Sequence, residues 1–266
     1  MCRWAAYIGE PTFLEEVVTA PCHSLIAQSH HALEAKTPTN GDGFGVAWYG
    51  ERTEPGLYRD ILPAWSDPNL KSICRQIASP LFLAHVRAST GGATSRMNCH
   101  PFVNGNWSFM HNGQIGHFDR LRRRLEATIA DELYDRLEGT TDSELFFLLM
   151  LEEGLAIDPL GATERAAARV IDAAHAAGVD AHLRLTAAFA NGQSLFAVRY
   201  ATDKFAPTLY AGETRKGRGR CLVSEPFDQE GCDWQAVPPG SFVTLTADNL
   251  TIAPFAPVRQ SVALVS

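Results

Sequence analysis

Apolar and polar positions follow two periods along this chain, one typical of strands and one typical of helices. Short apolar runs of strand length, bounded by turn-forming residues, dominate both ends of the chain, and longer runs with helical spacing lie between them. The strands are predicted over 4–8, 46–49, 57–62, 81–86, 106–111, 182–189, 194–200, 207–210, 220–223 and 241–245. The helices are predicted over 24–36, 67–78, 117–127, 142–153 and 158–177. This order predicts a layered α+β arrangement.

Local signals add detail at the ends of these elements. The Asn-Gly pair at 112–113 predicts a turn after the strand 106–111, and the pair at 191–192 predicts a hairpin. Thr141 and Glu144 have the spacing of a capping box at the start of a helix. The tail from Thr251 contains two prolines, and we expect it to lie along the surface.

Composition and charge restrict the class of protein. The 266 residues are 45% hydrophobic and 20% charged, which is typical of a globular protein. A net charge of −7 argues against a surface that binds nucleic acid or an anionic membrane. No apolar run reaches the length of a membrane span, and the run 4–8 is too short for a signal peptide. The six cysteines show no disulfide or zinc-finger spacing, so we expect a cytoplasmic protein without a metal or cofactor.

The chain also shows no repeat, low-complexity block or long linker. We therefore expect a single domain over 1–266, with the chemical motifs within 2–154, followed by a β-rich remainder over 180–250 and a C-terminal tail.

Cys2 stands directly behind the initiator methionine. Its side chain is small, so we expect Met1 to be removed and Cys2 to carry a free α-amine beside its thiol. The amine titrates near pH ~8 and the thiol near ~8.5, so both groups exchange protons near neutral pH. One residue would then supply a nucleophile and a base. Alone, a cysteine here is more typical of a small apolar start to a buried strand.

Four more polar clusters stand at the ends of predicted elements. They are Asn40–Gly45, His85–Gly92, His111–Gln114 and Thr141–Glu144. Each has an ordinary structural explanation, because Asn-Gly pairs form turns, Thr-Asp-Ser caps helices and a single histidine is often a core residue. The cluster Asn40–Gly45 precedes a strand, whereas a dinucleotide fingerprint opens a helix.

Taken together and in this order, these clusters resemble the glutamine-hydrolysing domain of class II glutamine amidotransferases, which are N-terminal-nucleophile hydrolases. The resemblance rests on the N-terminal cysteine, the string His-x-Arg-x-x-Thr from His85, the His-Asn-Gly string from His111, and Thr-Asp-Ser-Glu from Thr141. It implies a four-layer αββα sandwich of two antiparallel sheets. The chain is similar to the stand-alone type, which includes the ergothioneine-pathway γ-glutamyl hydrolase and uncharacterised relatives that also begin with Met-Cys-Arg.

The resemblance also implies roles for individual residues. Cys2 is the expected nucleophile, with Asn112 and Gly113 as the expected oxyanion hole. The expected substrate-binding residues are Arg87, assisted by Thr90, for the α-carboxylate and Asp142 for the α-ammonium, together with Gly91, which matches the family pattern. The loop residues Asp42 and Gly43, together with His111, are expected to line the pocket. Ala88 stands where relatives often have an aromatic residue, which predicts an open wall beside the substrate amide.

The expected activity is hydrolysis of glutamine or a γ-glutamyl amide, because no acceptor domain for ammonia is recognisable in the sequence. Two alternatives stay open: a glutaminase subunit that delivers ammonia to a separate synthase, and a non-catalytic glutamine-binding module. Metal-dependent hydrolysis is disfavoured because the histidines match no known ligand spacing. The histidines considered were His30, His31, His85, His100 and His111. The leaving-group pocket is predicted to involve Ala88, the strand 48–49 and the basic loop Arg215–Arg220, which alone is more typical of a solvated surface.

Overall fold

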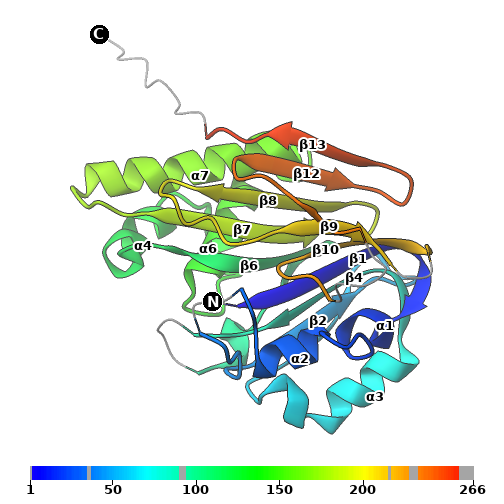
Figure 1. Cartoon of the computed structure of the whole chain (residues 1–266). Coiled ribbons are helices and arrows are strands. Elements are labelled where there is room, and N and C mark those ends of the chain that lie inside the picture. Colours follow the sequence, from blue (N-terminus) through cyan, green and yellow to red (C-terminus); the bar gives the residue numbers. More distant parts are fainter. Residues whose placement is uncertain (1, 35–36, 90–93, 215–216, 228–232, 258–266) are drawn as a thin grey trace.

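Two antiparallel β-sheets lie face to face and carry helices on their outer faces (Figure 1). The computed structural model describes residues 2–34, 37–89, 94–214, 217–227 and 233–257. One sheet has seven strands in the order β11-β9-β10-β1-β4-β2-β3, and the other has six in the order β13-β12-β8-β7-β6-β5. The helices α1 to α3 cover the first sheet and α4, α6 and α7 cover the second, which gives the expected αββα layers.

The strands of the first sheet are β1 (Arg3–Phe13), β2 (Phe44–Trp48), β3 (Gly56–Asp60), β4 (Ala78–Val86), β9 (Tyr210–Glu213), β10 (Gly219–Val223) and β11 (Gln235–Ala236). Those of the second are β5 (Phe102–Asn104), β6 (Trp107–Ile115), β7 (Leu183–Ala190), β8 (Leu195–Ala201), β12 (Ser241–Leu245) and β13 (Leu250–Pro254). The α-helices are α1 (Glu15–Val18), α2 (Leu25–His30), α3 (Pro68–Gln76), α4 (Phe118–Glu126), α5 (Asp131–Tyr134), α6 (Asp142–Glu152) and α7 (Pro159–Ala176).

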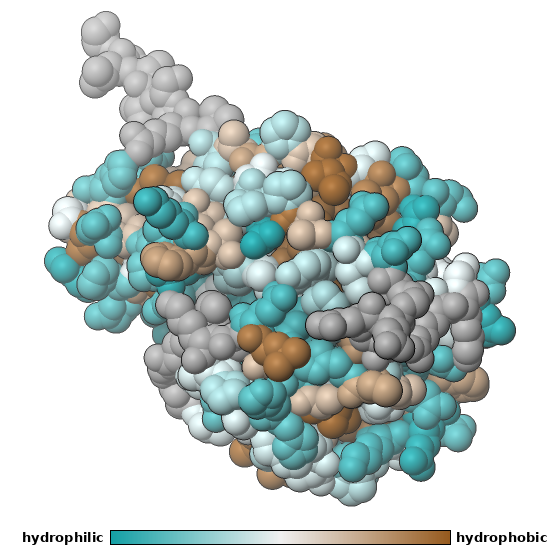
Figure 2. Space-filling model, viewed as in Figure 1, coloured by the Kyte–Doolittle hydropathy of each residue, from teal (hydrophilic) through white to brown (hydrophobic). Residues whose placement is uncertain are grey.

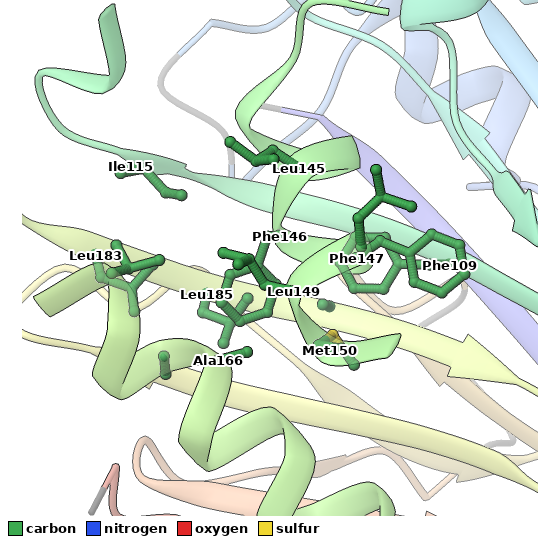
Figure 3. Packing of buried hydrophobic residues seen from close by; sticks show 14 of the residues in the cluster. Phe109, Ile115, Leu145, Phe146, Phe147, Leu149, Met150, Ala166, Leu183 and Leu185 are labelled. Carbon is green, nitrogen blue, oxygen red and sulfur yellow. The ribbon is translucent and has the colours of Figure 1, made fainter. Parts of the chain in front are cut away.

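Each sheet buries both faces, so its central strands are apolar on both sides. In β1, Trp4 packs between the two sheets, whereas Ala5 packs beneath the helices of the first sheet. On the other side, α6 places Phe147 against Phe109 of β6, with stacked rings whose centroids are 5.2 Å apart (Figure 3). Because both rings lie in the core, they fix α6 on the sheet. The first turn of α6 therefore has a defined position.

Most of the predicted elements are confirmed, with boundaries that differ by a few residues. The hairpin predicted at 191–192 joins β7 to β8, which pair antiparallel. The predicted helix 24–36 ends at His30 instead, because His31 adopts an extended conformation. The strand predicted over 207–210 begins only at Tyr210.

One further prediction was wrong, and another was incomplete. Residues 112–113 form no turn, because they continue β6 and pair with Thr186 and Leu185 of β7. Ladder pairing therefore overrides the turn preference of Asn-Gly. The tail from Thr251 does not simply follow the surface, because it forms β13 at the edge of the second sheet. Pro254 ends that strand, where a missing N–H is tolerated.

The capping box at α6 is only half formed. The Thr141 side chain accepts a hydrogen bond from the backbone N–H of Glu144, as predicted. The Glu144 carboxylate, however, accepts from the backbone N–H groups of Glu138 and Gly139. These two hydrogen bonds therefore hold the loop that precedes α6 in place.

The surface is mixed in character. On the face shown in Figure 2, hydrophilic residues are interspersed with separate apolar patches. Within the described part of the chain, no helix is both long and apolar enough to cross a membrane.

Candidate active site

A cavity of about 620 Å³ opens where the N-terminal end of β1 meets the start of α6. Cys2, Arg87, Gly113 and Asp142 all line it, although they come from four separate parts of the chain. Cys2 is half-buried, and its Sγ accepts a hydrogen bond from the backbone N–H of Ala88 at 3.4 Å. Burial raises the pKa of the Cys2 thiol, and the Ala88 contact lowers it in part. The thiol is therefore neutral at neutral pH.

Strand alternation explains why these side chains converge. Cys2 lies two residues before Trp4, which packs between the sheets, so its side chain points into the same layer. Asn112 follows the inter-sheet residue Met110 by two positions, so it also points there. Arg87 follows His85 by two positions, and His85 pairs with Trp4 across the β1–β4 ladder. These three polar side chains thus share one end of the inter-sheet layer, where Cys2 and Arg87 line the cavity and Asn112 is buried behind its wall.

Arg87 is held by backbone contacts on both sides. Its N–H donates to the Gly43 carbonyl at 2.8 Å, and its carbonyl accepts from Asp42. The guanidinium donates to the Asp42 carbonyl and to the Ser89 hydroxyl, each at 3.3 Å. Among the described residues it forms no ion pair, although its exposed fraction is only 4%. A buried cation without an anion favours a carboxylate ligand.

The loop of Asp42 and Gly43 supports Arg87 rather than lining the cavity. The Asp42 carboxylate accepts from the Ser89 N–H at 2.7 Å. Gly43 has φ +117°, and a Cβ there would lie 2.5 Å from the Cys99 sulfur, so glycine is required. Neither residue belongs to the described cavity wall. The predicted pocket role of this loop is therefore indirect.

Asn112 is fully buried, and neither polar atom of its side-chain amide has a hydrogen-bond partner within the described part of the chain. Gly113, the next residue, lines the cavity. A Cβ on Gly113 would lie 1.9 Å from the Arg184 carbonyl oxygen and 2.2 Å from His111 Nε2. The close packing of β6 against β7 therefore depends on glycine at this position.

His111 connects β6 with β7 and α6. Its Nε2 lies 3.0 Å from the Arg184 carbonyl, which can only accept, so Nε2 carries the hydrogen. Its Nδ1 lies 2.9 Å from the Ser143 hydroxyl. Asp142, beside Ser143, accepts from the Ile115 N–H at 2.8 Å. Burial lowers the pKa of His111, so the ring is neutral and positions the first turn of α6.

The structure corrects the predicted leaving-group pocket. Ala88 does line the cavity, as predicted. The strand 48–49 does not, because Trp48 pairs with Phe82 at the end of β2 remote from Arg87. In the basic loop, Arg220 pairs with Ile8, several residues along β1 from Cys2. Arg215 and Lys216 lie outside the described residues, as do the expected site residues Thr90 and Gly91.

Sequence reasoning missed other parts of the wall. His117, Phe118 and Arg122, from the start of α4, extend the cavity beyond Asp142. Their spacing in the sequence did not indicate a place in the cavity wall, because the pattern of this segment is typical of a helix with a solvent-exposed face. His100 also lines the cavity, although the sequence identified it only as a disfavoured metal ligand. Within the described residues, no group of three side chains has metal-ligand geometry.

Comparison with solved structures defines the class of fold. The glutamine phosphoribosylpyrophosphate amidotransferase of B. subtilis aligns with 97% of this chain and 50% of its own, at a TM-score of 0.67 and 14% identity. This likeness shows the fold alone, which is that of the N-terminal-nucleophile amidotransferases. A glutamine aminotransferase class-II domain protein from Silicibacter pomeroyi is 42% identical, with a TM-score of 0.76 over 96% of this chain and 100% of its own.

Sequence comparison identifies the family. The profile described as "Glutamine amidotransferases class-II" matches residues 13–211. The probable glutamine amidotransferase DUG3 of Saccharomyces cerevisiae is 35% identical over 96% of this chain and 84% of its own. The γ-glutamyl-hercynylcysteine sulfoxide hydrolase of Mycolicibacterium smegmatis is 28% identical over 96% of this chain and 100% of its own. The chain therefore belongs to the class-II glutamine amidotransferases, whose members are hydrolases or amidotransferases.

Proposed function

We propose that this protein hydrolyses the γ-amide of glutamine or of a γ-glutamyl amide through a thioester on Cys2, releasing glutamate and ammonia or an amine. One observation carries the proposal: a single cavity combines a thiol, a buried cation and a carboxylate, namely Cys2, Arg87 and Asp142. A glutamyl group carries the matching carboxylate, ammonium and electrophilic carbonyl. The M. smegmatis relative, by its name, also acts on a γ-glutamyl compound.

The two charged residues would hold the α-end of the substrate. Arg87 is fixed by the Asp42 carbonyl and the Ser89 hydroxyl, and its planar guanidinium suits a carboxylate. Asp142 already accepts one backbone N–H, and its charge suits the α-ammonium. Neither residue has an ion-pair partner among the described residues, so the substrate would neutralise both charges.

The chemistry would then proceed in two halves. The Cys2 sulfur attacks the γ-carbonyl carbon, and the Cys2 α-amine accepts the thiol proton. The Asn112 amide and the Gly113 N–H stabilise the oxyanion. The same amine donates the proton to the leaving nitrogen, the C–N bond breaks, and a thioester remains. Water then attacks the thioester, with the amine as base, and the thiol is restored as glutamate leaves.

The first experiment is intact-mass spectrometry before and after exposure to an electrophilic glutamine analogue. We expect loss of Met1 and a single adduct at Cys2, together with glutamate release from a panel of γ-glutamyl amides. Cys2→Ala is the matched control and should form no adduct. Processed protein that forms no adduct and releases no glutamate would contradict the proposal and favour a binding module.

The pH dependence of turnover tests the base. Burial raises the pKa of the Cys2 thiol, so little thiolate exists at neutral pH and attack requires a base. We expect kcat/KM to rise with pH through the titration of the α-amine, near pH ~8. A variant with one residue inserted between Met1 and Cys2 lacks this amine, and it should fold but lose turnover. Retained activity in that variant would exclude the N-terminal amine.

A further inference from the structure

His100 is a buried polar side chain of the cavity that the proposed reaction leaves unused. Its exposed fraction is 4%, and its ring lines the same cavity as Cys2 and Arg87. Neither ring nitrogen has a hydrogen-bond partner among the residues that the structure describes. Buried polar atoms in native proteins are nearly always bonded, so an unbonded pair beside a cavity indicates a ligand.

The ring is held in place by its neighbours. Its centroid lies 4.2 Å from that of His85 and 4.6 Å from that of Phe102. The backbone is fixed as well, because a Cβ on Gly45 would lie only 2.3 Å from the His100 carbonyl oxygen. The segment that carries His100 therefore packs directly on β2, and the imidazole presents its nitrogens from a rigid position.

The imidazole is neutral. Burial lowers the pKa of His100 well below its usual range, and the neighbouring His85, His111 and Arg87 act in the same direction. A neutral imidazole offers one N–H donor and one acceptor. Its donor can therefore bind a carboxylate without the ring carrying a charge of its own.

The position of His85 places the ring close to Arg87. His85 and Arg87 are two residues apart on one face of an extended segment, which separates them by about 7 Å. The His100 ring packs against that of His85, and both His100 and Arg87 line the same cavity. A carboxylate bound by Arg87 is then within reach of an N–H of His100.

We propose that His100 is a substrate-binding residue that donates a ring N–H to the α-carboxylate held by Arg87. This inference rests on the proposed function, because it assigns the glutamyl group as the ligand. It implies that the cavity recognises the α-carboxylate through two side chains, one charged and one neutral. The enzyme would then select glutamyl compounds over their decarboxylated analogues.

The test is the variant His100→Phe, which keeps an aromatic ring in the stack and removes both nitrogens. We expect KM for the hydrolysed γ-glutamyl amide to rise about 10- to 100-fold, the usual effect of one hydrogen bond to a charged group, with kcat changed less than about threefold. His100→Asn, which restores a donor, should recover part of the loss. An unchanged KM in His100→Phe would overturn the inference.

Two competitive inhibitors locate the contact. One is 4-carbamoylbutanoate, which is glutamine without the α-ammonium, and the other is 4-aminobutanamide, which is glutamine without the α-carboxylate. In His100→Phe, inhibition by the first should weaken about 10-fold or more, and inhibition by the second should not change. Equal weakening of both would place His100 away from the carboxylate and overturn the inference.

Thermal unfolding separates a binding role from a structural one. His100→Phe removes two unbonded buried atoms, so its melting temperature should equal or exceed that of the wild type. The matched control is His85→Phe, which loses the contact of His85 Nε2 with the His111 carbonyl and should melt lower. A lower melting temperature in His100→Phe with an unchanged KM would show a structural role. A wild-type enzyme that hydrolyses no γ-glutamyl amide would overturn this inference together with the proposed function.

Discussion

Two buried polar side chains of the candidate site have no hydrogen-bond partner among the described residues. Over the described ranges, the Asn112 amide is fully buried without a partner, and the His100 imidazole also lacks one. Leaving a buried polar group unbonded costs roughly 1–3 kcal/mol, so such groups destabilise the free protein. In the proposed reaction, the oxyanion of the transition state would accept a hydrogen bond from the Asn112 amide, and the substrate carboxylate would accept one from His100. Each hydrogen bond would offset part of that cost.

Asn112→Ala tests this argument at the oxyanion hole. We expect kcat to fall about 10²- to 10³-fold, because one oxyanion donor is lost. The free energy of unfolding should change little through hydrogen bonding, because the amide has no partner to lose. The measurements are steady-state kinetics and urea unfolding of the same preparations.

Thr186→Val is the matched control for Asn112→Ala. Thr186 pairs directly with Asn112 across β6 and β7, and its hydroxyl donates to the Pro207 carbonyl at 2.9 Å. Its loss should cost about 1 kcal/mol of stability with kcat nearly unchanged. If Asn112→Ala retained full kcat, the oxyanion role would be wrong.

Among the elements, β6 positions the site most directly. It continues through Asn112 and Gly113 to Ile115, whose N–H binds Asp142 at the start of α6. One uninterrupted strand thus connects the expected oxyanion hole to the expected ammonium site. A turn at 112–113, as the sequence predicted, would have separated these two parts.

Gly113→Ala should disrupt this strand. The added Cβ would meet the Arg184 carbonyl oxygen and the His111 ring at distances that force both to move. We expect a loss of about 1–3 kcal/mol in the free energy of unfolding, as for other overpacked sites. Gly50→Ala is the control, because no heavy atom lies within 4 Å of a Cβ there and its stability should stay close to wild type. Equal stability of the two variants would contradict the packing argument.

The elements and motifs were largely predictable from the sequence, and the exceptions have physical causes. Period and capping signals located β4 and α6, and with them Arg87 and Asp142. The Asn-Gly signal at 112–113 failed because pairing with β7 is a long-range interaction that local chemistry does not encode. His100 was missed as a cavity residue because its place depends on packing against His85, which lies on a different element.

At the scale of the whole molecule, the interior near the cavity holds three neutral histidines. His85, His100 and His111 are each at most 4% exposed. Burial lowers the pKa of all three, that of His85 to about 3. They come from different segments, namely β4, the segment before β5, and β6, so global unfolding exposes all three to water.

This arrangement predicts loss of stability in acid. Below pH ~6.5 the unfolded chain binds protons at these histidines while the folded protein does not, so stability falls as pH falls. Each histidine contributes up to about 1.4 kcal/mol per pH unit, until its folded pKa is reached. Urea unfolding at pH 7 and pH 5.5 measures the loss, and His100→Phe should reduce it by the share of one histidine. A stability that stays constant between these pH values would contradict the neutral, buried state of the cluster.

The central position of β1 has a consequence for the timing of synthesis. This strand pairs on one edge with β4 and on the other with residues 219–223 of β10. At about 5–20 residues per second, the ribosome needs roughly 10 to 45 seconds to extend the chain from Cys2 to Val223. Throughout that interval one edge of the nascent amino-terminal strand has no partner. The proposed mechanism requires removal of Met1, and a peptidase acting within that interval would meet a strand with one unpaired edge.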